Sequence, residues 1–129
     1  MKTSKSGFTL IELLMVVVII GLLASIAIPK FSSTRERAYL AALRADLRNL
    51  ANQQDVYYND NYTYTTNVTN LQFDNSAGVT INFGEATNLG WSASAVHQAL
   101  GTTQLCSIYH GNAAQVAPAT VVSTVQCTN

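Results

Sequence analysis

Residues Ser4 to Phe31 read "SKSGFTLIELLMVVVIIGLLASIAIPKF", and this stretch decides the fold. From Leu13 to Ile28, only Gly21 and Ser25 are not plainly apolar. As a helix, the run from Phe8 to Ile28 would be roughly 31 Å long, close to the hydrocarbon thickness of a bilayer. The stretch therefore predicts a helix that is long enough to cross a membrane.

Glu12 places a carboxylate inside this apolar run. Thr9 and Glu12 have the spacing of a capping box, and a carboxylate in the first turn also suits the positive end of the helix dipole. Each effect is worth about 1 kcal/mol, whereas a charge at the bilayer centre costs about 2.5 to 3.5 kcal/mol on insertion scales. Capping therefore explains where a glutamate is tolerated better than why one is needed. If the chain were cut after Gly7, the new amino group of Phe8 would lie one helical turn before Glu12 and would face it or the Glu12 of a neighbouring copy.

The charged residues are unevenly placed along the 129 residues. The formal net charge is zero, with seven Lys or Arg and seven Asp or Glu. All the cations lie at or before Arg48, and the carboxylates after it are Asp55, Asp60, Asp74 and Glu85. The C-terminal half is therefore mildly acidic and has no basic groove for phosphates, which argues against a direct nucleic-acid site.

Pro29 and the residues after it predict a change in the helix. Proline lacks an amide donor and disfavours helical geometry in the residue before it, so we expect a kink or local loosening near Pro29. Beyond it, one stripe at helical spacing is formed by Leu40, Leu43, Leu47, Leu50, Gln54 and Tyr57. We expect the charged residues of this segment largely off that stripe, namely Arg35, Glu36, Arg44 and Arg48. The pattern predicts an amphipathic helix over 30–58 that packs one face on a sheet, in preference to a free coiled coil.

The last third of the chain predicts short strands after a connector rich in Asn, Thr and Tyr. Glycines and one proline separate four segments with strand-like composition, at 78–83, 90–96, 105–110 and 119–127. Such segments form a small antiparallel sheet that could cover the helix stripe. The predicted fold class is therefore α+β, a long N-terminal helix packed on a small antiparallel β-sheet head.

The sequence contains no recognisable catalytic set. His97 and His110 are isolated, and neither a metal-ligand spacing nor a phosphate-binding glycine loop is present. We therefore expect no enzyme activity, no metal and no cofactor. Of the two cysteines, Cys106 and Cys127, neither belongs to a CxxC pair. If the C-terminal half is exported, a single disulfide is the simplest interpretation.

The short basic leader ending in Gly7, followed by "FTLIELLMVVVIIGLLASIAIPKF", closely resembles the type IV pilin family. The resemblance implies that a prepilin peptidase cleaves between Gly7 and Phe8 and N-methylates Phe8. It places the family's glutamate, fifth in the mature chain, at Glu12 and its helix-loosening proline at Pro29. Phe8, Glu12 and Pro29 are thus the implied assembly residues. The motif covers about the first thirty residues, and the likeness over the rest depends on the order of elements and the late cysteine pair.

The resemblance also implies a domain organisation and a topology. The expected parts are a leader peptide 1–7, a transmembrane and assembly helix 8–29, an amphipathic helix 30–58, and a globular head 59–129. A simple count of cations would leave the head in the cytoplasm, but long domains translocate largely regardless of charge. We expect the leader inside and the head outside, where a disulfide between Cys106 and Cys127 would persist and delimit a C-terminal surface region.

These inferences predict a structural subunit of a type IV pilus, or fimbrium. Its precursor would wait in the inner membrane and then polymerise into an extracellular filament for adhesion, twitching motility or DNA uptake. The implied partners are other copies of the chain, the prepilin peptidase and the inner-membrane pilus assembly machinery. Alternatives are a pseudopilin of a type II secretion system, a minor pilin at the filament tip, and a membrane-tethered binding module.

Overall fold

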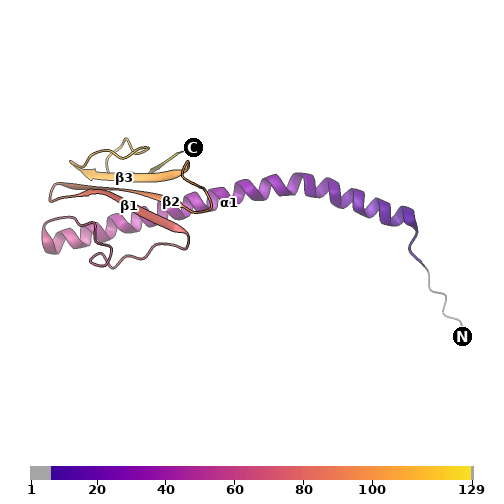
Figure 1. Ribbon diagram of the computed structural model, residues 1–129, viewed down its shortest axis with the longest axis horizontal. Coiled ribbons are helices and arrows are strands. Elements are labelled where there is room, and N and C mark those ends of the chain that lie inside the picture. The colour runs from indigo at the N-terminus through magenta and orange to yellow at the C-terminus, as the bar shows by residue number, and fades with distance from the viewer. Residues whose placement is uncertain (1–6, 129) are drawn as a thin grey trace, which may run out of the picture. The chain divides into compact units, whose positions relative to one another are not determined.

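Helix α1, Leu10–Asn61, is the longest element of the computed structural model, which describes residues 7–128 (Figure 1). The chain divides into two compact units, one up to Arg35 and one from Glu36 onward, and α1 contributes to both. It ends at Asn61, beyond the expected boundary at residue 58. Tyr62 takes a left-handed φ of 55°, and its N–H donates to the Tyr58 carbonyl at 2.8 Å. This left-handed residue closes the helix in the way that C-terminal caps do.

The second unit holds an antiparallel sheet in the order β1-β2-β3-β4. Its strands are β1 (Val79–Ala86), β2 (Gly90–His97), β3 (Leu105–Gly111) and β4 (Gln126–Cys127). Consecutive strands pair throughout, so each connection joins neighbours (Figure 1). The predicted α+β class, a long N-terminal helix packed on a small antiparallel sheet, is confirmed.

The core lies between α1 and one face of this sheet. Leu43, Leu47 and Leu50 are fully buried. They form one cluster with alternate residues of β2 and β3, namely Trp91, Ala93, Ala95, Cys106 and Ile108. Leu40 and Tyr57, at the two ends of the predicted stripe, pack against this cluster and are partly buried. The predicted stripe and its burial on a sheet are therefore confirmed.

Glu36 and the last predicted strand differ from expectation. Glu36 is half-buried and accepts a hydrogen bond from Gln104, whereas we expected it largely off the stripe. The strand predicted over 119–127 is wrong for most of its length, because β4 consists only of Gln126 and Cys127. The residues before β4 bond to side chains and to isolated carbonyls in place of a strand ladder: the amides of Thr120 and Val121 donate to Gln126 Oε1.

Two buried polar side chains of α1 hold the connector that leads to β1. Gln54 is fully buried, and its amide donates to the Thr65 carbonyl at 2.6 Å and accepts from the Thr65 N–H at 3.1 Å. Asp46 is 4% exposed, and its carboxylate accepts from the N–H and the hydroxyl of Ser76, both at 2.8 Å. Because buried polar groups are costly unless paired, these contacts fix the connector's path over the helix.

Replacing Gln54 with leucine is expected to lower the free energy of unfolding by about 1–3 kcal/mol, because the N–H and C=O of Thr65 would lose their partner. Unfolding of the full chain in detergent can be followed by the fluorescence of Trp91, which is 1% exposed. Gln53→Leu is the matched control, since no hydrogen bond of the Gln53 side chain is found in the described part of the chain. Equal stability of the two variants would contradict the clamping role of Gln54.

Candidate functional site

The expected cleavage site lies just before α1. Gly7, Phe8 and Thr9 precede the helix without regular structure, and Phe8 is 77% exposed. Both residues of the Gly7–Phe8 bond are therefore exposed and outside the helix. The rest of the expected leader, residues 1–6, lies outside the described residues.

Thr9 and Glu12 form the predicted capping box at the start of α1. The Thr9 N–H and the Thr9 hydroxyl donate to Glu12 Oε2, at 2.8 Å and 2.7 Å. The Glu12 N–H in turn approaches Thr9 Oγ1 at 3.4 Å. Capping boxes satisfy two N–H groups that the helix start leaves unpaired. The local interpretation of Glu12 is thus confirmed, and the expected pairing with a Phe8 amine stays a prediction.

The first half of α1 is apolar on all sides, and its side chains are exposed. Large apolar residues from Leu10 to Ile28 are between 45% and 83% exposed. By length and composition, α1 could cross a membrane. An exposed apolar surface of this extent indicates a membrane or protein contact. These features suit a precursor that is anchored in a membrane.

Pro29 lies inside α1, and the helix continues through it. Proline has no N–H to donate to the carbonyl four residues earlier, that of Ser25. Nearby hydroxyls bond to helix carbonyls: Ser33 and Thr34 both donate to the Lys30 carbonyl, at 3.1 Å and 2.9 Å. The structure thus shows an unbroken helix at Pro29, and the expected local loosening stays a prediction.

Cys106 and Cys127 form a disulfide between the paired strands β3 and β4. The C-terminal loop, residues 112–125, precedes β4. Ser107 is fully buried; its hydroxyl donates to the Val116 carbonyl at 2.6 Å and accepts from the Ala119 N–H at 2.9 Å. The disulfide therefore closes a loop that also has its own hydrogen bonds to the sheet.

Tyr109 adds a second attachment for the C-terminal loop. Its hydroxyl donates to the Thr120 carbonyl at 3.1 Å and accepts from Gln115 Nε2 at 3.2 Å. The Tyr109 carbonyl accepts from the N–H of Ser123, which has a left-handed φ of 57°. Sequence reasoning missed this loop because the run "ATVVSTVQC" has a strand-like composition. The signal that could have pointed to the loop was Pro118, which stands just before this run and cannot donate within a ladder.

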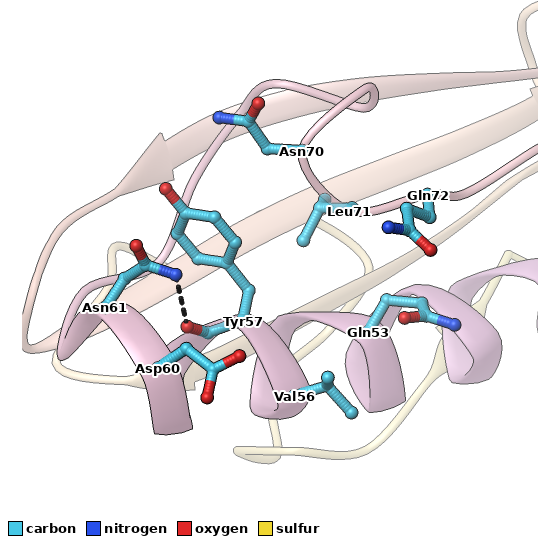
Figure 2. A pocket seen from close by; sticks show the side chains of 8 residues that line it. All are labelled: Gln53, Val56, Tyr57, Asp60, Asn61, Asn70, Leu71 and Gln72. Atoms are coloured by element: carbon cyan, nitrogen blue, oxygen red, sulfur yellow. Dashed lines mark hydrogen bonds between the residues drawn. The ribbon is translucent and has the colours of Figure 1, made fainter.

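A pocket of about 430 Å³ lies between the last turns of α1 and the connector (Figure 2). Its lining is Gln53, Val56, Tyr57, Asp60, Asn61, Asn70, Leu71 and Gln72. In Figure 2, Tyr57 extends from the helix toward Asn70 and Leu71. Asn61 Nδ2 donates to the Tyr57 carbonyl at 3.0 Å. The lining has one carboxylate, one phenol and four amide side chains, so the pocket suits contact with polar groups.

The two histidines are engaged in structural contacts. His97 is 6% exposed, stacks on Tyr39 with ring centroids 4.1 Å apart, and its Nδ1 accepts from the Ala99 N–H at 3.1 Å. His110 Nδ1 lies 2.7 Å from the Ser123 hydroxyl. Within residues 7–128, no cluster of three or more potential metal-ligating side chains was found. The geometry therefore directs attention to the exposed helix and the head surface.

Residues 2–28 match the family described as the prokaryotic N-terminal methylation motif. A relative in Pseudomonas aeruginosa, the type II secretion system core protein G, is 35% identical over 71 residues, or 55% of this chain and 50% of the relative. The type IV wide pilus major component PilA4 of Thermus thermophilus is 43% identical over 67 residues, or 52% of this chain and 50% of the relative. The N-terminal segment of this chain is therefore that of a type IV pilin-like prepilin. The chain spans about half the length of the curated relatives it matches.

The family motif covers the capping box and the apolar half of α1 together. The head of this prepilin, by contrast, presents no catalytic arrangement among the described residues.

Proposed function

We propose that this prepilin is a structural subunit of a type IV pilus. In this proposal, cleavage after Gly7 and methylation of Phe8 precede polymerisation through α1. The observation that carries the proposal is the exposed apolar half of α1 in a chain whose residues 2–28 match the methylation motif. The major pilus component of Thermus thermophilus among its relatives supports it.

The assembly step replaces contacts between α1 and lipid with contacts between copies of α1. Lipid tails are as apolar as leucine, so the hydrophobic effect contributes little net free energy to this exchange. Specificity must come from packing and from polar groups in the apolar segment. Glu12 is the acid available there, and the methylated amine of a neighbouring Phe8 is its proposed partner. A subunit in the wrong axial register would leave both charges unpaired, which is costly in an apolar setting.

Cleavage would also change the charge of the subunit. Removal of Lys2 and Lys5 takes the count from seven cations and seven carboxylates to five and seven, a side-chain charge of about minus two. A mildly acidic surface suits a filament that stays soluble outside the cell. The proposed path runs from the inner membrane to the extracellular filament, with the prepilin peptidase and the inner-membrane assembly machinery as partners and adhesion, motility or DNA uptake as the task.

A second candidate is a pseudopilin of a type II secretion system. Relatives named type II secretion system core protein G, in Pseudomonas aeruginosa and in Escherichia coli, favour it. The Escherichia coli protein is 42% identical over 60 residues, or 46% of this chain and 41% of the relative. Both candidates use the same proposed processing and helix packing. They differ in whether the filament extends outside the cell or stays within the envelope.

Intact-mass spectrometry of filaments sheared from the cell surface tests the proposal. We expect the mass of residues 8–129 with one methyl group added and two hydrogens removed by the disulfide. Processed protein that stays in the envelope and is absent from sheared material would favour the pseudopilin. An uncut form beginning at Met1 would contradict both and favour a membrane-tethered binding module.

A further inference from the structure

Three arginines form an exposed stripe along the second half of α1. Arg37, Arg44 and Arg48 are all exposed and lie seven and four residues apart. At 3.6 residues per turn, these spacings bring them to the same side of the helix. This arginine stripe lies off the face that buries Leu43, Leu47 and Leu50. Arg48, at the C-terminal end of the three, also borders a pocket that Ile108 and Val125 line.

Asp55 continues the same line on α1. It follows Arg48 by seven residues and Arg37 by eighteen, which is five full turns of an α-helix. Asp55 is also exposed. From its N-terminal end to its C-terminal end, the stripe therefore carries three cations and then one anion. The distance along the helix axis from Arg37 to Asp55 is roughly 27 Å, at 1.5 Å per residue.

In the part of the subunit that the structure describes, no ion pair neutralises the arginine stripe. Arg44 and Arg48 stand four residues apart, where like charges on a helix repel. Asp46 lies between them in sequence, but its carboxylate accepts from the N–H and hydroxyl of Ser76. No carboxylate within hydrogen-bonding distance of the stripe is found among residues 7–128. A carboxylate from another copy of the chain would offset the repulsion between Arg44 and Arg48.

The seven carboxylates of the chain divide clearly by their partners. Four accept hydrogen bonds within the subunit: Glu12 from Thr9, Glu36 from Gln104, Asp46 from Ser76 and Glu85 from Ala114. The carboxylates of Asp55, Asp60 and Asp74 have no such bond in the described structure. Asp60 lines the pocket on another side of α1, and Asp74 lies in the connector. Asp55 is therefore the free carboxylate that lies on the stripe.

Tyr64 lies near Asp55 at the end of α1. Burial raises the pKa of Tyr64, and the negative charge of Asp55 raises it further. The proposal for Asp55 depends on its exposure and on the absence of a hydrogen bond to its carboxylate among the described residues.

We propose that Asp55 of one copy of this chain pairs with Arg48 of the next copy in the filament. This rests on the proposed function, because helices that share one membrane topology assemble in parallel. When two parallel helices are offset by about 10.5 Å along the axis, residue 55 of one helix lies at the same height as residue 48 of the other. Arg44, one turn before Arg48, adds to the positive potential that Asp55 meets. The pair favours this offset between the two copies that it joins, which need not be the two copies joined by Glu12 and Phe8.

Charge reversal and charge exchange test the pairing in cells that carry the chain as their filament subunit. Arg48→Asp and Asp55→Arg are each expected to reduce sheared filaments about tenfold or more, because like charges then meet at the offset. The exchanged variant, Arg48→Asp with Asp55→Arg, is expected to restore at least half of the filaments. Arg35→Asp and Asp60→Arg are matched controls with the same charge changes off the stripe, and we expect them to assemble normally.

Single reversals that assemble as well as these controls, or an exchanged variant no better than the single ones, would overturn the pairing. Wild-type chain that forms no filament, at the surface or in the periplasm, would overturn the proposed function as well, so the two failures are distinct. Cleavage after Gly7 and the fluorescence of Trp91 confirm in each variant that processing and folding are intact.

Cysteine crosslinking measures the offset directly. Arg48→Cys with Asp55→Cys is expected to give a ladder of covalent multimers in non-reducing gels. Within one subunit these positions lie about 10.5 Å apart, too far for a disulfide. The mismatched variant, Arg48→Cys with Asp60→Cys, is expected to stay monomeric. A ladder from the mismatched variant and none from the matched one would contradict the proposed register.

Discussion

Replacing Glu12 with alanine is expected to reduce filaments about tenfold or more while cleavage after Gly7 continues. The proposed partner of Glu12 is the methylated amine of Phe8 in a neighbouring subunit. Removing one member of a buried ion pair leaves the other charge uncompensated, at a cost of about 3–5 kcal/mol. Since every 1.4 kcal/mol is about tenfold in an equilibrium, even partial exposure of the site leaves a large effect. Counting sheared filaments and measuring the processed fraction of the chain check both halves of the prediction.

Two further substitutions separate the charge of Glu12 from its capping role. Glu12→Gln keeps a side chain that suits a capping box but removes the charge, and we expect it to assemble as poorly as Glu12→Ala. Thr9→Ala removes the hydroxyl that donates to Glu12 Oε2 at 2.7 Å but leaves the carboxylate, and we expect its filaments to be nearly normal. Normal assembly of Glu12→Gln together with failure of Thr9→Ala would show that Glu12 acts as a helix cap and would contradict the register role.

The long helix and its core face could be predicted because they depend on local spacing. The Thr9 and Glu12 spacing predicted a capping box, and the structure has its hydrogen bonds. The 3, 4 spacing of leucines predicted the buried face, because residues at that spacing share one side of a helix. Even Gln54 was correctly placed on the stripe, although its partner, the backbone of Thr65, is not visible from spacing.

The C-terminal loop could not be predicted, because its conformation depends on contacts between distant residues. Val121, Val122 and Val125 suggest a strand by composition, yet the loop is held by the side chains of Ser107, Tyr109 and Gln126. A serine in the middle of a strand gives no sign in the sequence that it will receive a loop from twelve residues away. The arginine stripe, by contrast, was present in the sequence, but its meaning required knowledge of which carboxylates are already engaged.

Removing the disulfide, with Cys106→Ser and Cys127→Ser together, is expected to lower the free energy of unfolding of the head by about 3 kcal/mol. The two cysteines are 21 residues apart, and a closed loop of that size restricts the unfolded chain by about this amount. A small domain has little other stability to spare, so the loss is a large share of the total. Denaturant unfolding of the full chain in detergent, followed by Trp91 fluorescence, measures it.

Reduction of the wild-type protein is the matched control for the disulfide prediction. Wild-type chain with reductant should unfold at the same denaturant concentration as the double serine variant, which should itself be insensitive to reductant. A loss below about 1 kcal/mol would mean that the hydrogen bonds of Ser107 and Tyr109 hold the C-terminal loop by themselves. In that case the disulfide would serve to resist proteolysis or pulling forces on an exported filament, and filaments of the serine variant would form normally but break more readily under shear.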